Sequence, residues 1–429
     1  MMHSTLIDPK WSLSKKIAFR FFFILLISLI FLNNNNAFLY VQQLFFYPTE
    51  ILHQFVPWFA KSILRYHYDY SIFPNGSGDT SYNYILLLIL VLASLLGCLI
   101  WSVLDRKRTN YSKLYYWLIV LVRYYLGFTM MLYGSVKIIQ LQFPQPTLHR
   151  LLEPIGETSP MGLAWTFLGF STGYNIFMGI LEVSAALLLF RRTMVMGAFI
   201  ALIASVNIMA INYFFDVPVK LLSTTLMVMS MFILAPYIIT IIKFLLFEES
   251  QRLNPLQPPF FRKKWQNISF IAIKYLIIIW TVVVMVNNAL TQQHIYGSQL
   301  PKPPLYGIYN VSEYILNGKT VAPLTIQENK WKQMVIEYKD LASIKTIDDS
   351  FAYFNLALNQ KDKKMELISK KPDSNQYKFN YKFENDSTLV LSGTRNQDAL
   401  TIKLSKYNLN NFRLINQGFH WINEYPNNH

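Results

Sequence analysis

Cysteine is almost missing from this 429-residue chain, whose one cysteine, Cys98, lies within an apolar run. A disulfide, a CxxC redox motif and a thiolate metal site each need at least two cysteines. All three are therefore excluded within a single copy of the chain.

Charge is scarce as well. Only 15% of the residues are charged, against about 25% in soluble domains, and 53% are hydrophobic. The net charge of +15 is concentrated before residue 300, which holds 22 of the 39 basic and 11 of the 24 acidic residues. The excess lies mostly in short connections between apolar runs, so it indicates membrane topology and not nucleic-acid binding.

Motifs of the common enzyme classes are also missing. The seven histidines form no HExxH or HxxxH pair, and there is no GxSxG, no paired catalytic carboxylates and no Gly-rich phosphate loop. We therefore expect no metal and no flavin or nucleotide cofactor, and the sequence leaves open whether the protein is an enzyme.

The chain instead contains apolar runs of about 20 residues, which are long enough to span a bilayer. Seven are found: Ile17–Leu39, Tyr84–Leu104, Leu114–Ile139, Gly169–Phe190, Thr193–Tyr213, Val219–Phe247 and Ile268–Val286. The connection after the first run holds an amphipathic stretch, Thr49–Leu64, which predicts an interfacial helix.

Basic clusters alternate between the runs. Lys15-Lys16, Arg106–Arg108, Arg191-Arg192 and Arg262–Lys264 all fall on one side if there are seven spans. The positive-inside rule makes that side cytoplasmic. This predicts a multi-pass inner-membrane protein with a cytoplasmic N-terminus and a periplasmic C-terminal part.

After about Gln293 the apolar period changes from 3.6 to 2. About seven short strands between residues 331 and 406 predict a small antiparallel barrel or sandwich, with Phe419, Trp421 and Ile422 bracing it. The fold class is thus a mainly α-helical polytopic membrane protein with a C-terminal all-β domain. The expected segments are 1–110 (two spans and a long outer loop), 111–247 (a four-helix bundle), 248–292 (a cytoplasmic loop and the last span) and 293–429 (the β-domain).

Charged residues lie inside the predicted bundle. Arg123, Gly127, Gly134 and Lys137 fall on one helix face, with the glycines suited to close helix packing. The depth of each residue in the membrane can be counted along its helix from the nearest basic residue on the cytoplasmic side. By this count Arg123 and Glu182 lie at the same depth. Because a lone charge there costs about 2.5–3.5 kcal/mol, we expect an Arg123–Glu182 ion pair.

The stretch "INYFFDVPVKLLS" adds Asp216 and Lys220 at the outer rim. Asp216 before Pro218 suits a helix cap, and Lys220 can extend to the headgroups. The alternative is that Lys220, Lys137, Asp216 and Asn207 line one outward-opening pocket that holds a quinone head or an anionic substrate.

Four segments together resemble the DoxX family of small four-helix membrane proteins: Arg123–Ile138, Gly179–Thr193, Met196–Ile211 and Phe214–Met229. The resemblance covers roughly Leu114–Tyr237, and it places Arg123, Gly127, Gly134, Lys137 and Glu182 on the family's pattern. It implies a helical bundle, and for some relatives a link to quinone-dependent sulfur oxidation or to the maturation of redox enzymes.

We therefore expect a DoxX-like membrane protein that binds a hydrophobic or redox-active small molecule, with quinone as one such ligand, or a protein partner, at the outer side of its bundle. Two alternatives remain open. One is a membrane-anchored scaffold or sensor that works through its β-domain, and the other is a transporter of a small anionic or lipid-like substrate.

Overall fold

A computed structural model describes residues 10–32, 37–38, 41–66, 76–248, 263–297, 299–321, 330–370 and 376–426. The chain divides into two compact units. We call Met1–Phe143 with Ser159–Gly297 the helical unit, and Pro144–Thr158 with Ser298–His429 the barrel unit. The second includes a segment from within the predicted 111–247 bundle, which sequence analysis did not separate.

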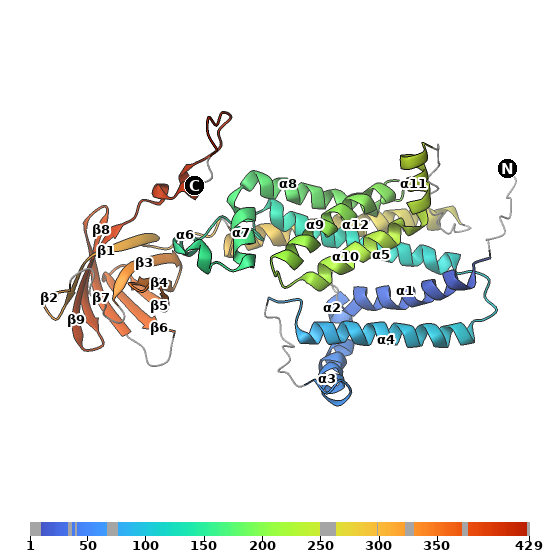
Figure 1. Ribbon diagram of the computed structural model, residues 1–429, viewed down its shortest axis with the longest axis horizontal. Coiled ribbons are helices and arrows are strands. Elements are labelled where there is room, and N and C mark those ends of the chain that lie inside the picture. The colour runs from blue at the N-terminus through green and yellow to red at the C-terminus, as the bar shows by residue number, and fades with distance from the viewer. Residues whose placement is uncertain are drawn as a thin grey trace. The chain divides into compact units, whose positions relative to one another are not determined.

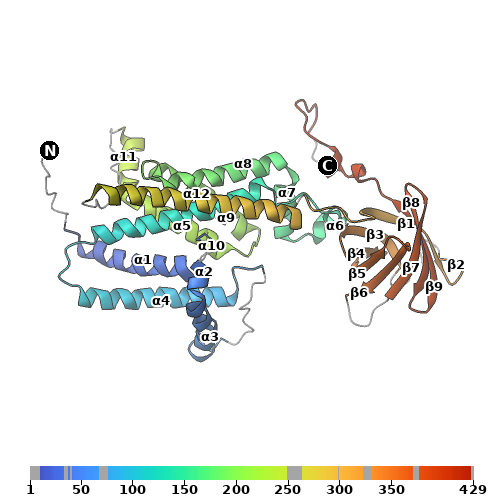
Figure 2. The same cartoon turned by 180° about the vertical axis from the view of Figure 1, so that it is seen from behind.

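The helical unit consists of the helices α1 (Leu13–Leu32), α2 (Val41–Leu44), α3 (Phe46–Ser62), α4 (Ser81–Leu104), α5 (Ser112–Ile138), α7 (Pro160–Phe170), α8 (Thr172–Val183) continued by η2 (Ser184–Leu189), α9 (Met194–Phe214), α10 (Lys220–Leu234), η3 (Ala235–Tyr237), α11 (Ile238–Phe247) and α12 (Lys264–Ile295). The long helices of the helical unit run side by side in two opposite views, while α3 and α11 lie across them (Figures 1 and 2).

Six helices of the described chain are long and apolar enough to cross a membrane, by length and composition. They are α4, α5, α8 with η2, α9, α10 with α11, and α12, and they indicate a multi-pass membrane protein. The first predicted span, Ile17–Leu39, corresponds in its described part to α1, which is not among the six.

Helix α1 contains a buried arginine. Arg20 is 2% exposed, and it donates to Ser102 Oγ at 2.8 Å, to the Asp105 carbonyl at 3.0 Å and to Tyr111 Oη at 2.8 Å. These bonds satisfy a charge that an apolar surrounding would otherwise penalise. They also attach α1 to the end of α4 and the start of α5.

Helix α5 lies at the centre of the helical unit. It contacts α1, α8, α9, α10 and α12, and it is more buried than any other candidate span. Its small and polar face, predicted from Arg123 to Lys137, therefore faces other helices, as packing in membranes favours.

The start of α10 is capped from a distant loop. Asp79 accepts hydrogen bonds from the backbone N–H of Lys220 at 2.6 Å and of Leu221 at 3.0 Å, which satisfies two free donors at the positive end of the helix dipole. The prediction that Asp216 caps this helix is therefore wrong. Asp216 instead has a left-handed φ of 51° and pairs with Lys220 Nζ at 2.8 Å.

The barrel unit is a closed antiparallel barrel of eight strands, with β2 as a short addition to β1 (Figure 1). The strands are β1 (Gly307–Leu316), β2 (Lys319–Thr320), β3 (Trp331–Tyr338), β4 (Leu341–Thr346), β5 (Phe351–Asn359), β6 (Lys364–Ser369), β7 (Gln376–Asn385), β8 (Thr388–Arg395) and β9 (Asp398–Lys406). β1 pairs with β3, each strand from β3 to β8 pairs with its successor, and β1 also pairs with β9, which closes the barrel.

The barrel core follows the alternation of the sequence. On β7, Tyr377, Phe379 and Tyr381 are buried, while the residues between them are exposed, as the period of 2 requires. The seven predicted strands are confirmed as β3 to β9, and β1 was missed. The expected bracing by the C-terminal segment is wrong, because Phe419, Trp421 and Ile422 are 76%, 91% and 77% exposed.

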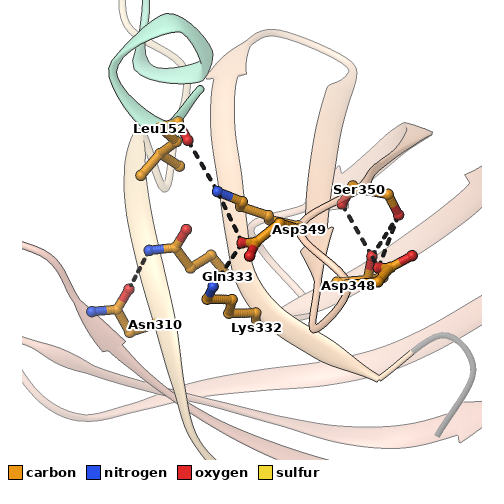
Figure 3. Close-up of polar contacts among 9 residues, drawn as sticks. Leu152, Asn310, Lys332, Gln333, Asp348, Asp349 and Ser350 are labelled. Carbon is orange, nitrogen blue, oxygen red and sulfur yellow. Dashed lines mark hydrogen bonds and ion pairs between the residues drawn. The ribbon is translucent and has the colours of Figure 1, made fainter. Parts of the chain in front are cut away.

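A short helix, α6 (Leu148–Leu152), packs on β3 of the barrel. Glu337 accepts a hydrogen bond from the Leu148 N–H at 2.8 Å, and Lys345 Nζ donates to the Leu152 carbonyl at 3.0 Å. Lys345 also pairs with Asp349 at 3.2 Å (Figure 3). The two ends of α6 are thus both attached to barrel side chains.

His149 makes the attachment of α6 dependent on pH. Its Nε2 lies 2.8 Å from Tyr353 Oη and its ring packs on Phe351, and burial lowers the pKa of His149 below its usual 6.5. Neutral His149 therefore stabilises the contact of α6 with the barrel fully above pH 6.5. This stabilisation is lost as the pH falls through the lowered folded-state pKa of His149. We expect faster amide exchange in α6 at acid pH, measured by hydrogen exchange with mass spectrometry.

The control for this prediction is His149→Gln, which has no titrating group at that position. Burial raises the pKa of Glu337 above 4.5, so its stabilising effect has the opposite sign and is lost as pH rises through the raised value. Both proteins contain Glu337, so subtracting the pH profile of His149→Gln from that of wild type removes the Glu337 contribution. Identical pH profiles of the two proteins would refute the role of His149.

Candidate functional site

The helical unit contains a cavity of about 210 Å³ between α5, α7, α8, α9 and α10. One ordered water needs only about 10–15 Å³ by this measure, so the cavity can hold a much larger group. It is lined by Met130, Tyr133, Lys137, Gln142, Phe143, Trp165, Leu168, Tyr174, Phe177, Met178, Leu181, Glu182, Ile203, Ala204, Asn207, Ile208, Ile211, Asn212, Val219, Leu222, Ser223 and Leu226.

An ion pair forms the most polar part of this lining. Lys137 Nζ lies 2.8 Å from both carboxylate oxygens of Glu182, and the two residues are only 4% and 3% exposed. The rings of Tyr133 and Phe143 lie 5.8 and 5.7 Å from the ammonium. An ammonium has three donors, so the two bonds to Glu182 leave one for another acceptor.

Two glycines bring the two charges together. A Cβ added at Gly134 would lie 2.7 Å from the Gly179 carbonyl oxygen, and one added at Gly179 would lie 2.6 Å from Ile138 Cγ1. Only glycines allow α5 and α8 to approach so closely. A Cβ added at Gly127, the other glycine predicted for packing, would lie 3.1 Å from Leu189 Cδ2 of η2.

The predicted Arg123–Glu182 pair is wrong in its partner, because Glu182 pairs with Lys137. The glycine contact places Glu182 near Gly134, and Arg123 lies eleven residues, about 16 Å, back along α5. The predicted depths were counted from Lys113 for Arg123 and from Arg191 for Glu182, which assumes that these two basic residues lie at the same level. In the structure the turn after η2 instead lies beside Arg123, whose Nη1 is 3.8 Å from Met194 Sδ.

The predicted pocket is only partly assembled. Lys137 and Asn207 line the cavity, whereas Lys220 and Asp216 do not. Lys137 and Asp216 are not brought together, since Asp216 pairs with Lys220 and its side chain is 83% exposed. The sequence did not single out two aromatic residues of the lining, Trp165 on α7 and Phe143 in the connection after α5.

The cavity borders an exposed apolar surface between α8 and α9. Its lining includes Phe177, which is 63% exposed, and Ile203, which is 61% exposed. Asn207, on α9, is also exposed. The α9 helix contacts η2 more extensively than it contacts α8, so the helices separate beside the cavity. A ligand dissolved in the bilayer could reach Lys137 by this side.

A second polar atom of the lining lacks a partner. Gln142 Oε1 is buried and accepts no hydrogen bond in the described part of the chain, although such acceptors are usually satisfied. By contrast, Asn212 donates to Ser223 Oγ at 3.1 Å and to the Val219 carbonyl at 3.2 Å. The site therefore offers a donor on Lys137 and an acceptor on Gln142.

The described ranges contain no group of three or more His, Cys, Asp and Glu side chains that could hold a metal ion. The cavity can instead bind a ligand through one charged contact, one neutral acceptor and extensive apolar surface, the usual composition of a small-molecule site.

Comparison with known proteins relates part of the chain to an uncharacterized protein. No family model and no solved structure matches it. Over 115 residues it is 42% identical to the uncharacterized protein YwoB of Bacillus subtilis (strain 168). That segment is 26% of this chain and 71% of YwoB, and on this evidence the chain belongs to the family of YwoB.

Proposed function

We propose that the helical unit binds a lipid-soluble small molecule with a polar head, of the quinone class, in the cavity at Lys137 and Glu182. The observation that carries the proposal is the buried Lys137–Glu182 pair at the wall of an otherwise apolar cavity. The free donor of Lys137 suits a quinone carbonyl, and Gln142 Oε1 suits a hydroxyl of the reduced form.

The setting of the cavity supports a ligand from the membrane. The exposed side between α8 and α9 suits access from the hydrocarbon phase, and the apolar lining suits an isoprenoid tail. The resemblance of Leu114–Tyr237 to the DoxX family points in the same direction. Together with α1 as a seventh span, the basic clusters favour an inner-membrane protein with a cytoplasmic N-terminus and a periplasmic barrel unit.

The test is the quinone content of the full chain purified in mild detergent, measured by solvent extraction and mass spectrometry. We expect extractable quinone in wild type and a loss of roughly tenfold or more in the double variant Lys137→Met/Glu182→Met, because it removes the polar contact. Lys220→Met is the matched control, since Lys220 does not line the cavity. Wild type without quinone, even after addition of a short-tailed naphthoquinone, would refute the proposal.

A second candidate function is ligand or partner binding by the barrel unit, with the helices as an anchor. It is favoured by a space of about 580 Å³ lined by Tyr306, Tyr309, Tyr381, Lys302 and Lys406, among others. If the cavity variants retain ligand as wild type does, and Lys406→Ala does not, this candidate replaces the first.

A further inference from the structure

Three basic side chains gather in the helical unit outside the cavity lining. Arg123 lies on α5, Arg191 in the turn between η2 and α9, and Lys274 on α12. Arg123 interacts electrostatically with Arg191, and Lys274 interacts with both arginines. Arg123 is only 5% exposed, and the other two are half-buried.

Contacts with the turn that carries Arg191 show how the three converge. Lys274 Nζ lies 5.5 Å from the ring of Phe190, just before Arg191. Arg123 Nη1 lies 3.8 Å from Met194 Sδ, just after it. Lys274 and Arg123 thus contact residues that flank Arg191 in sequence, Phe190 and Met194, which brings the three basic residues to one region of the helical unit.

This site has excess positive charge. No carboxylate of the described residues pairs with Arg123, Arg191 or Lys274. The Arg123 guanidinium lies 5.5 Å from the Tyr124 ring, and its Nε is buried without a hydrogen-bond partner. The N-terminus of α9 also begins at Met194, and its N-cap Thr193 makes no side-chain capping bond. Unpaired buried charges are costly, and cations at a helix N-terminus favour an anion there.

We propose that Arg123, Arg191 and Lys274 bind the phosphate group of an anionic phospholipid. Arginine matches the geometry of phosphate oxygens, and basic pockets between membrane helices are suited to lipid head groups. The face of α12 beside Lys274 provides the apolar surface for acyl chains, since Ile273, Leu276 and Ile277 are 56%, 68% and 47% exposed. This site is separate from the quinone cavity and does not depend on it.

The experiment measures lipid retained by the full chain after detergent purification and reconstitution, with phosphatidylglycerol and phosphatidylcholine as probes and native mass spectrometry as the readout. We expect wild type to retain phosphatidylglycerol in preference to phosphatidylcholine. Lys274→Gln and Arg191→Gln, both at half-buried positions, should each lower retention of phosphatidylglycerol roughly tenfold. Arg192→Gln is the matched control, because Arg192 is exposed and next in sequence.

Three outcomes would overturn the proposal. The first is unchanged retention in both variants, and the second is equal retention of the two lipids by wild type. The third is that inorganic phosphate fully displaces phosphatidylglycerol and raises the thermal stability of the protein as much as phosphatidylglycerol does. That result would assign the site to free phosphate. A fall in retention with Arg192→Gln as large as with Arg191→Gln would reduce the effect to general surface charge and also count against it.

Discussion

Lys137→Met is expected to lower the free energy of unfolding of the helical unit by about 3 kcal/mol. The substitution removes the ammonium that contacts both oxygens of Glu182 at 2.8 Å. It leaves a carboxylate that is 3% exposed with no cation, or forces it to take up a proton. The measurement is equilibrium unfolding in mixed detergent micelles, followed by circular dichroism.

The double variant Lys137→Met/Glu182→Met provides the decisive comparison. Replacing both partners of a buried pair by apolar groups is often neutral or stabilising, so we expect it to recover most of the lost stability. Lys113→Met, at an exposed position on the same helix, should change little. If the double variant is less stable than Lys137→Met alone, the two charges do not form the coupled pair described above.

Gly134→Leu is expected to destabilise the helical unit by about 3 kcal/mol or more, at the upper end of the range for an overfilled core. Its Cβ would lie 2.7 Å from the Gly179 carbonyl oxygen and 2.9 Å from the Val183 nitrogen. These are backbone atoms and move only if the helices separate. Separation would also break the Lys137–Glu182 pair, so quinone retention should fall along with the unfolding midpoint.

The control for Gly134 is Gly173→Ala on α8, where an added Cβ would meet only Ser171 Oγ, at 3.9 Å. It should be as stable as wild type, because the added methyl group has room there, on the helix that packs against α5. Because Gly134→Leu and Lys137→Met act on the same contact, their effects should be less than additive. Full additivity would show that the glycine contact and the ion pair are independent.

Sequence predicted the barrel strands well, because each alternates apolar and polar residues and ends at a turn signal. The strand β1 was missed since Gly307–Leu316 alternates weakly: Gly307, Ile308 and Tyr309 are buried in succession. The place of α6 on the barrel was not predictable either, since its contacts to Glu337 and Lys345 join residues almost 200 positions apart.

The polar residues of the bundle were found, but not how they pair. A helical pattern places Lys137, Arg123 and Glu182 on interior faces, whereas their partners depend on how far one helix is displaced along the next. That displacement is set by the contact of Gly134 with Gly179, which has no counterpart in the apolar pattern. The cap of α10 by Asp79 was hidden for the same reason, since it joins residues 141 positions apart.

The pairing of β1 with β9 also has a consequence for how the protein is made. Tyr309 pairs with Lys406, so the ring of hydrogen bonds cannot close until almost a hundred further residues have been synthesised. Pairings of such long range make folding slow, and until β9 arrives β1 and β8 both present unpaired edges. The nascent domain therefore passes through a stage that is prone to aggregation, and chaperone protection would be needed there and not after closure.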